Sequence, residues 1–197
     1  MPRKTSSPLT SDDWIKAAFR NLAEGGVSAI KAEVLAKQLK TTKGSFYWHF
    51  KDVSTFRHSM LKLWETEATA RIMKTVMSTS AEGSQRLHIL SQIISQMNTT
   101  NDYGGSRAEP AIRDWGRIDK LAETALRRVD EARLEFVTGL FIDSDFPPPE
   151  ARMKAELFYC CFIGLQALAA NALIDVSVRM NEMLQLLLSN KQTPVNL

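Results

Sequence analysis

The sequence predicts an all-α protein with a small N-terminal domain followed by a larger helical domain. Apolar residues recur at spacings of three and four along most of the chain, and no segment alternates with the period of a β-strand. Nine Gly and seven Pro in 197 residues are too few for the many turns of an all-β protein. The share of hydrophobic residues, 44%, is typical of a globular chain.

The first part of the chain predicts three short helices behind a basic arm, residues 1–9. Ser11 is the expected N-cap of a helix over 11–24, which Gly25 and Gly26 end. A second helix is expected over 31–38, with Val34 facing inward, and a third is expected to run from its cap Thr42 to about residue 49. So short a break between the second and third helices is typical of a helix-turn-helix. The expected core of this unit is Phe19, Leu22, Leu35, Leu39, Phe46 and Phe50.

The remainder of the chain predicts longer helices. Their expected ranges are 52–77, 84–98, 110–115, 118–141, 150–173 and 176–189. Asp52 is a suitable N-cap for the first of them, and three prolines ahead of residue 150 mark the clearest stop in the chain. We therefore expect a helix-turn-helix domain over 1–51 and a helical domain over 52–197.

Charge is distributed unevenly between these two parts. Residues 1–51 carry nine Lys or Arg and four acidic residues, a net charge of +5, whereas residues 52–197 carry 16 basic and 18 acidic residues, a net charge of −2. A basic head suggests a polyanionic partner, although a bias of this size by itself is also expected of an ordinary solvated surface.

Several classes of protein are not supported by the sequence. No apolar run approaches the roughly 20 residues of a membrane span, and the N-terminus lacks the apolar region of a signal peptide. The adjacent Cys160 and Cys161 diverge by about 100° on a helix, so they do not readily form a disulfide with each other. We find no nucleophile–base pair, paired carboxylates, phosphate-binding loop or metal-ligand spacing. We therefore expect a cytoplasmic protein that is not an enzyme, with no cofactor, no metal and no membrane partner.

The stretch over residues 41–51 carries the clearest functional signal. On the expected third helix, Phe46 and Phe50 face one way, whereas Lys43 and Tyr47 share another face with polar and aromatic neighbours. A surface helix rarely exposes Tyr, Trp and His beside lysines without a partner. These side-chain types bind DNA phosphates and base edges, so the pattern favours DNA binding.

This region resembles the DNA-binding domain of TetR-type transcriptional repressors over residues 10–64. The residues that carry the resemblance are Leu35-Ala36-Lys37-Gln38-Leu39 and Gly44-Ser45-Phe46-Tyr47-Trp48-His49-Phe50. Lys40 stands where that family usually has a turn glycine, Thr41 where it often has an apolar residue, and Val53 where it frequently has a lysine.

The resemblance implies that the third helix enters the major groove. Tyr47, His49 and Lys51 would then contact phosphates, while Thr42, Lys43, Gly44 and Trp48 would lie nearer the bases. Alternatively, Trp48 packs against the first helix and His49 caps the third, while Lys37 and Lys40 are best read as solvated charges. The full set of expected DNA-binding residues is Lys31, Thr41, Thr42, Lys43, Gly44, Ser45, Tyr47, Trp48, His49 and Lys51.

The resemblance also implies a second domain that dimerises and binds a small molecule. Met and aromatic side chains suit an adaptable pocket, although each of them is also an ordinary core residue. The expected ligand-binding residues are Trp64, Met73, Met97, Tyr103, Trp115, Phe158, Tyr159, Phe162 and Gln166. The expected homodimer interface is Leu126, Leu134, Cys161, Gly164, Leu165, Leu168 and Ala172, the alternative being a buried core helix in a monomer. Mixed charges over 113–117 and 127–131 are expected to form salt-linked helix surfaces.

The leading hypothesis is therefore a ligand-responsive homodimeric repressor that binds double-stranded DNA at a palindromic operator. A transcriptional activator of the same family and a sequence-indifferent nucleic-acid binder remain the alternatives. The long helix that starts at residue 52 is the expected lever, because it leaves the DNA-binding unit and ends in the second domain.

Overall fold

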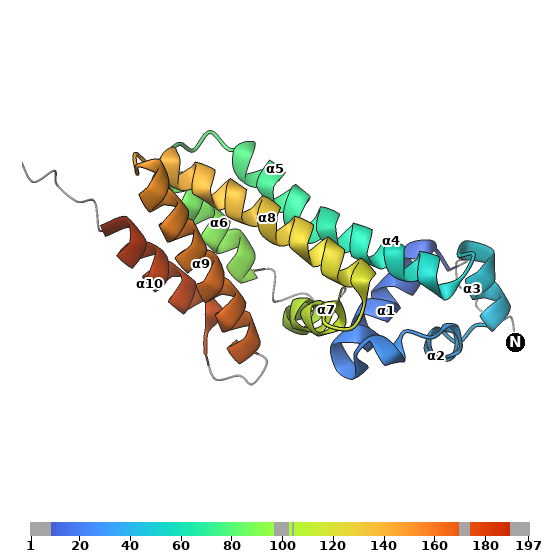
Figure 1. Cartoon of the computed structure of the whole chain (residues 1–197). Helices are drawn as coiled ribbons and strands as arrows, with labels where there is room; N and C mark the ends of the chain where they lie inside the picture. The colour runs from blue at the N-terminus through green and yellow to red at the C-terminus, as the bar shows by residue number, and fades with distance from the viewer. Residues whose placement is uncertain (1–8, 97–102, 104, 170–173, 190–197) are drawn as a thin grey trace, which may run out of the picture.

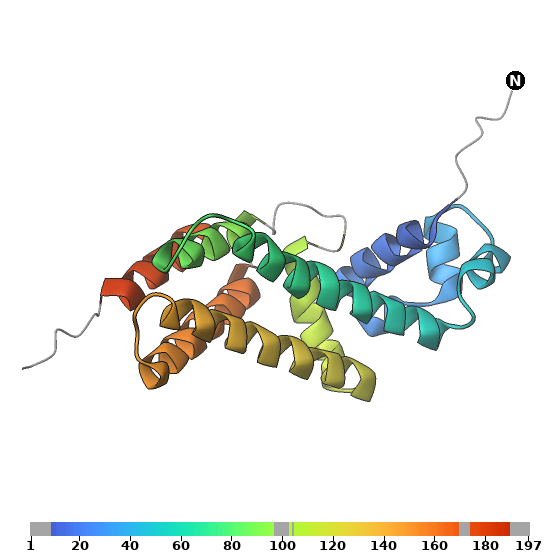
Figure 2. The same ribbon diagram turned by 90° about the horizontal axis from the view of Figure 1, so that it is seen from above.

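The computed structural model describes residues 9–96, 103, 105–169 and 174–189, and all regular structure in these ranges is helical. The molecule is elongated, with α1 (Ser11–Gly25), α2 (Ala32–Gln38) and α3 (Lys43–His49) at one end (Figure 1). At the other end lie α6 (Ser84–Gln96), α9 (Pro148–Ala169) and α10 (Val176–Ser189), and Figure 2 shows the same separation from above. The prediction of an all-α fold with an N-terminal helix-turn-helix is confirmed.

The first helix begins through a reciprocal cap. Thr10 is its N-cap, not the expected Ser11: the Thr10 hydroxyl accepts a hydrogen bond from the Asp13 N–H at 3.3 Å, and the Asp13 carboxylate accepts one from the Thr10 N–H at 2.8 Å. Asp13 lies three residues after Thr10, and the two reciprocal hydrogen bonds between them form a capping box. At the other end Gly26 has φ 67°, a conformation that suits glycine.

The turn between α2 and α3 accommodates a non-glycine residue. Lys40 has φ 53°, and Thr42 then caps α3 by accepting a hydrogen bond from the Ser45 N–H at 3.3 Å. Val34 is exposed, contrary to expectation. Successive helical residues are rotated by about 100°, so Leu35 on the inner face of this short helix leaves Val34 on the outer one.

The long helix expected over 52–77 is present but interrupted. It consists of α4 (Val53–Glu65), a π-helical turn η2 (Thr66–Ala70) and α5 (Arg71–Met77). Asp52 caps it as expected, accepting a hydrogen bond from the Thr55 N–H at 2.7 Å. A single π-turn inserted in an α-helix is often found at a functional site.

Two further helices complete the molecule, α7 (Ala108–Gly116) and α8 (Lys120–Ile142). In Figure 1, α4 and α8 run along the length of the molecule between its two ends. The expected start of α9 at residue 150 is wrong by two residues, because Pro148 already fits the first helical turn. The expected ends at residues 98 and 173 lie outside the described residues.

The buried side chains form two hydrophobic cores. The first joins α1, α2 and α3 to α4, α7 and the first half of α8, and the second joins α5, α6, α9 and α10 to the second half of α8. The first core crosses the expected domain boundary, since the rings of Phe46 and Phe50 lie 5.1 and 4.6 Å from that of Phe56. Three short helices bury little apolar surface by themselves, so the long helices complete their core. A boundary after residue 51 stays a prediction.

Candidate DNA-binding surface and ligand pocket

The outer face of α3 presents the side chains that the sequence singles out for DNA. Phe46 anchors the helix, being fully buried, whereas Tyr47 and Trp48 on the same helix are 47% and 83% exposed. An indole this exposed is not packed against the first helix, so that alternative for Trp48 is excluded. Thr42, Lys43 and Gly44 are also exposed.

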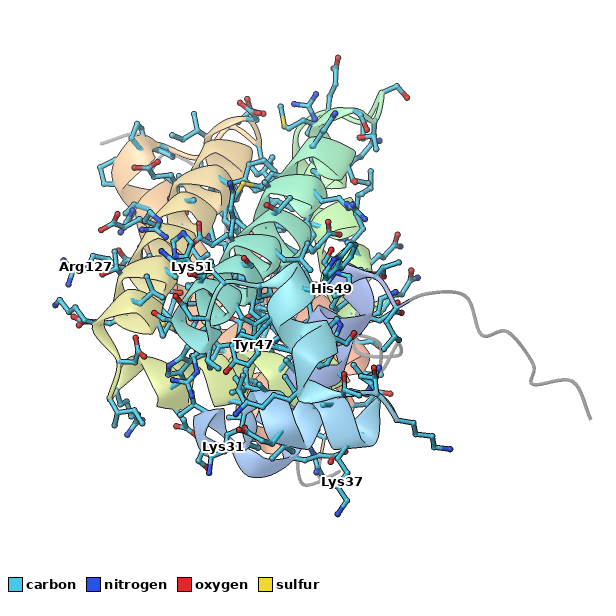
Figure 3. All side chains as sticks on the ribbon, turned by 90° about the vertical axis from the view of Figure 1, so that its right-hand side faces the viewer. Lys31, Lys37, Tyr47, His49, Lys51 and Arg127 are labelled. Atoms are coloured by element: carbon cyan, nitrogen blue, oxygen red, sulfur yellow. The ribbon has the colours of Figure 1, made fainter. Side chains whose placement is uncertain are left out.

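The remaining expected DNA-binding residues frame this face. Lys31 and Lys51 are exposed, whereas Thr41, Ser45 and His49 are half-buried. Figure 3 views this end directly and shows Tyr47 near its centre, with Lys31, Lys37, His49 and Lys51 around it. The His49 ring lies between those of Trp48, at 4.8 Å, and Trp14, at 6.5 Å. The fold thus brings the expected residues to one end of the molecule.

Lys43 already has a partner within the chain. Its Nζ pairs with the Glu33 carboxylate on α2 and lies 5.9 Å from the centroid of the Tyr47 ring. The hydrogen bond to Glu33 raises the pKa of Lys43 and lowers the pKa of Glu33. Both side chains are well exposed, so the pair is screened by solvent and easily exchanged for a phosphate or a base edge.

A second site lies where the two cores meet. A cavity of about 1110 Å³, including its opening to solvent, is lined by Phe19, Leu63 and Trp64 from the first core and by Ile72, Phe158 and Phe162 from the second. Its mostly apolar and aromatic lining with a few convergent polar groups is typical of a small-molecule site. Phe19 belongs to α1. The lining of the cavity therefore includes the N-terminal unit of α1, α2 and α3, which we call the DNA-binding head.

Arg133 of α8 is the central polar group in this cavity wall. Its Nε donates to the Thr69 hydroxyl at 3.1 Å, and its two terminal nitrogens donate to Glu109, to the Tyr159 hydroxyl and to the Ala68 carbonyl, at 2.6 to 3.3 Å. All five guanidinium N–H groups are therefore in use. Ala68 and Thr69 lie in the π-turn, so this arginine ties η2 to α7, α8 and α9.

A charged network continues behind Arg133. Arg113 donates to Asp130 at 2.8 Å and to Glu109 at 3.0 Å, and the Tyr159 hydroxyl donates to Asp130 at 2.6 Å. Burial raises the pKa of Tyr159, which keeps it a neutral phenol. The expected salt link is present for Arg113 and Asp130, which pair across α7 and α8, although at a partly buried position.

Most of the expected ligand-binding residues come together in this cavity. Those that line it are Trp64, Met73, Tyr103, Phe158, Tyr159, Phe162 and Gln166. Trp115 does not: it is 2% exposed in the first core and lies beside a separate shallow recess between α1 and α7. Met97 lies outside the described residues.

Sequence reasoning missed the polar wall of the cavity. Arg133 lies four residues after Val129 and four before Val137, so a charged residue interrupts an apolar stripe of α8. That pattern was visible and indicates a buried, partnered charge. Glu109, at 7% exposure, and Phe19, which belongs to the head, are lining residues that no search for Met and aromatic residues in the second domain finds.

The expected dimer residues divide between core and surface. Leu126 and Leu165 are buried in the chain's own cores, and Leu134 and Cys161 are half-buried. Gly164 is exposed and Leu168 is 43% exposed, whereas Ala172 lies outside the described residues. The exposed face of α9 carries an apolar stripe at spacings of four, three, four and four: Met153, Leu157, Cys160, Gly164 and Leu168.

Within the described ranges no cluster of three or more His, Cys, Asp or Glu residues is placed to hold a metal ion. The same residues contain no helix with the length and apolarity that crossing a membrane requires.

Comparison with known proteins assigns this architecture to a class. Residues 15–52 match the family model described as bacterial regulatory proteins, tetR family. The helix-turn-helix of this chain is therefore similar in sequence to that of bacterial regulatory proteins of the tetR family. A sequence comparison with curated proteins finds no match.

Solved structures extend the likeness to nearly the whole chain. FadR from Bacillus subtilis, in complex with stearoyl-CoA, is 16% identical with a TM-score of 0.72, covering 91% of this chain and 98% of that one. The fatty acid degradation regulator FadR from Bacillus halodurans is 15% identical with a TM-score of 0.73, covering 96% and 99%. A regulator from Saccharomonospora viridis in complex with choline is 13% identical with a TM-score of 0.69, covering 90% and 92%. The chain has the fold of TetR-family transcriptional regulators.

Proposed function

We propose that this protein is a homodimeric transcriptional repressor that releases a palindromic operator when a small molecule occupies the cavity. The observation that carries the proposal is the position of the cavity: its lining includes Phe19 of α1 and Leu63 and Trp64 of α4, which also pack in the core of the DNA-binding head. Solved relatives in fold with stearoyl-CoA or choline support a small-molecule role for the second domain.

The reading surface is the outer face of α3. Lys31, Tyr47, His49 and Lys51 would contact phosphates and fix the position of the head on the duplex. Thr42, Lys43, Gly44 and Trp48 would lie nearer the base edges, with Lys43 exchanging Glu33 for a base. Thr41 and Ser45 complete the proposed surface.

The coupling between the two sites would run along the long helix. α4 begins at Val53, directly after the head, and reaches the cavity at Leu63 and Trp64. The π-turn lines the cavity with Glu67, Ala68 and Thr69, and Arg133 holds it to α8. A ligand that binds one of two arrangements of this turn more tightly would shift the head between two orientations.

The proposed dimer forms along the apolar stripe of α9. Leu157 and Leu168 are 50% and 43% exposed, and Gly164 between them lets a partner helix approach closely. A second copy is the natural partner, because a helix-turn-helix protein reads a palindrome with two heads about 34–36 Å apart. Repression is preferred to activation because a bound dimer blocks polymerase by occupancy alone.

The test is a selection from random duplex DNA with purified protein at about 150 mM salt. We expect a palindrome whose half-site spacing matches one helical turn of DNA or a multiple of it. Recovery of unselected sequence would instead favour a sequence-indifferent binder. Transcription from a template that carries the selected site then separates repression from activation.

The dimer is tested by Leu157→Glu, which places a charge in the proposed stripe. We expect this variant to sediment as a monomer and to lose affinity for the palindrome. The matched control is Ile118→Glu, because Ile118 is 77% exposed in the connection between α7 and α8, away from the stripe. If both variants remain monomeric, or both remain dimeric, the stripe is not the interface.

A further inference from the structure

Some polar groups around the cavity have all their hydrogen-bond partners within the chain and others do not. This difference determines which ligands the cavity can bind. The charged side chains among its described lining residues are Glu67, Glu109 and Arg133. Two carboxylates therefore face one guanidinium. Neither Lys nor His lines the cavity within the part of the chain that the structure describes.

Arg133 has nothing left to offer an anion. Each of its five N–H groups already donates within the chain, to Thr69, Glu109, Tyr159 and Ala68. A ligand carboxylate that displaced Glu109 from Arg133 would cost Glu109, which is 7% exposed, two of its hydrogen bonds and leave it only its contact with Arg113. Burial of a carboxylate without donors is costly, so the cavity disfavours anions.

Gln166 offers the opposite chemistry. It lines the cavity from α9, is 8% exposed, and its buried Oε1 has no hydrogen-bond partner among the described residues. A buried acceptor without a donor is destabilising, and a ligand that donates a hydrogen bond to it recovers this cost. Nearby lie the rings of Tyr159, Phe158 and Phe162, which suit an apolar body or a cation.

We infer that the cavity selects an apolar molecule that carries a hydrogen-bond donor and no negative charge, with Gln166 Oε1 as the acceptor that recognises the donor. An alcohol, a phenol or an alkylammonium ion meets this description, and a fatty acid anion does not. The inference rests on the proposed function only in taking this cavity as the effector site.

The test uses three ligands that share one apolar chain: decan-1-ol, decylammonium and decanoate. Binding to the full-length protein is measured by isothermal titration calorimetry at pH 7, below the micelle concentration of each compound. We expect decan-1-ol and decylammonium to bind at least tenfold more tightly than decanoate. Equal or tighter binding of decanoate would overturn the inference.

Two substitutions at one position identify the recognising atom. Gln166→Met removes the acceptor at nearly constant volume and should weaken decan-1-ol binding by about tenfold while leaving decanoate unchanged. Gln166→Lys supplies a cation and should make decanoate the preferred ligand. Met73→Leu, an apolar change in the same lining, is the matched control and should preserve the order of the three ligands.

A separate readout distinguishes failure of the inference from failure of the proposed function. Release of the selected palindrome is measured with each ligand at saturation. Selective binding of decan-1-ol without release of DNA leaves the ligand class standing and overturns the effector role. If none of the three ligands binds, the ligand class and the cavity's effector role fall together, while operator recognition stands on its own test. Thermal melting of each variant checks that it is folded.

Discussion

The proposed DNA-binding residues all lie between residues 31 and 51, whereas the cavity draws its walls from residues as far apart as Phe19 and Gln166. The first surface consists of α3, its flanking turns and Lys31 at the start of α2, and most of its side chains are exposed. The second consists of buried side chains from α1 and from helices of both cores. The difference teaches that DNA reading and ligand sensing place different demands on stability.

The residues of the reading surface project from a helix that is itself stabilised by the first hydrophobic core. Tyr47 and Trp48 project from α3, and α3 is held by Phe46 in the first core. Substitutions on this surface should change DNA binding and leave folding intact. In the cavity the same atoms serve packing and recognition, so substitutions there should affect both.

The largest effect is expected at Arg133. Its replacement by Met should lower the free energy of unfolding by about 3–5 kcal/mol, because the buried Glu109 carboxylate loses its main partner. The measurement is chemical denaturation. Arg128→Met is the control, since Arg128 pairs with Glu65 at an exposed position and should cost less than about 1 kcal/mol. Equal losses in the two variants would contradict a special role for the buried network.

Lys43 tests the reading surface. Lys43→Ala should reduce discrimination at one base pair of the selected site by about 1–3 kcal/mol, because a base-edge contact is lost. Lys51→Ala is the comparison: it should weaken binding to all duplexes and reduce the slope of log affinity against log salt by about 0.9. Binding assays at several salt concentrations measure both. A uniform loss of affinity in both variants would refute the assignment of Lys43 to the bases.

The cap of α1 tests a local stabilising device in the head. Asp13→Ala should cost about 1 kcal/mol at neutral pH, because it removes one half of the capping box. Hydrogen bonds from the Thr10 backbone and hydroxyl lower the pKa of Asp13, so its contribution is full above the ordinary carboxyl pKa of ~4.

The contribution of Asp13 is lost as the pH falls through its lowered pKa in the folded state. Denaturation of wild type and variant from pH 7 to pH 2 should therefore show the difference shrinking toward zero in acid. Glu24→Ala, at an exposed position in the last turn of α1, should show no such difference. A gap between wild type and Asp13→Ala that persists at pH 2 would argue against this cap.

The smallest effect on stability is expected at Trp48. Trp48→Ala should leave the free energy of unfolding within about 0.5 kcal/mol of wild type, because the indole is 83% exposed. Trp64→Ala, at a tryptophan that is 5% exposed beside the cavity, should cost about 3–5 kcal/mol. The same substitution in the two regions thus separates an effect on DNA binding from an effect on packing. Comparable decreases in melting temperature in Trp48→Ala and Trp64→Ala would contradict this distinction. Affinity for the palindrome should fall in Trp48→Ala.

Much of the local structure was predictable from residue type and spacing. The reading helix, its Thr42 cap, the exposed Trp48 and the left-handed Lys40 follow from a motif confined to a few turns of chain. The same reasoning predicted Ser11 as the N-cap of the first helix, whereas the structure has Thr10. Both residues suit the position, and only the reciprocal hydrogen bond with Asp13 decides between them.

The cavity was predictable only in part. Its aromatic and Met residues stand out by type, but the same types fill cores, and Trp115 shows that composition does not separate the two roles. The charges of α7 and α8 indicate surface ion pairs when each helix is considered alone. Only the packing of α7 against α8 and α9 makes Glu109, Arg133 and Tyr159 one buried network.

The sequence by itself determined the helical periodicity, the helix-turn-helix and the chemical character of its outer face, because those depend on neighbours within about four residues. The tertiary structure alone decided that Phe19 of the head meets Gln166 of α9 around one cavity, and that Arg133 has no donor left for a ligand. Burial and hydrogen-bond saturation depend on residues far apart in the chain, and no local pattern encodes which of them fold against each other.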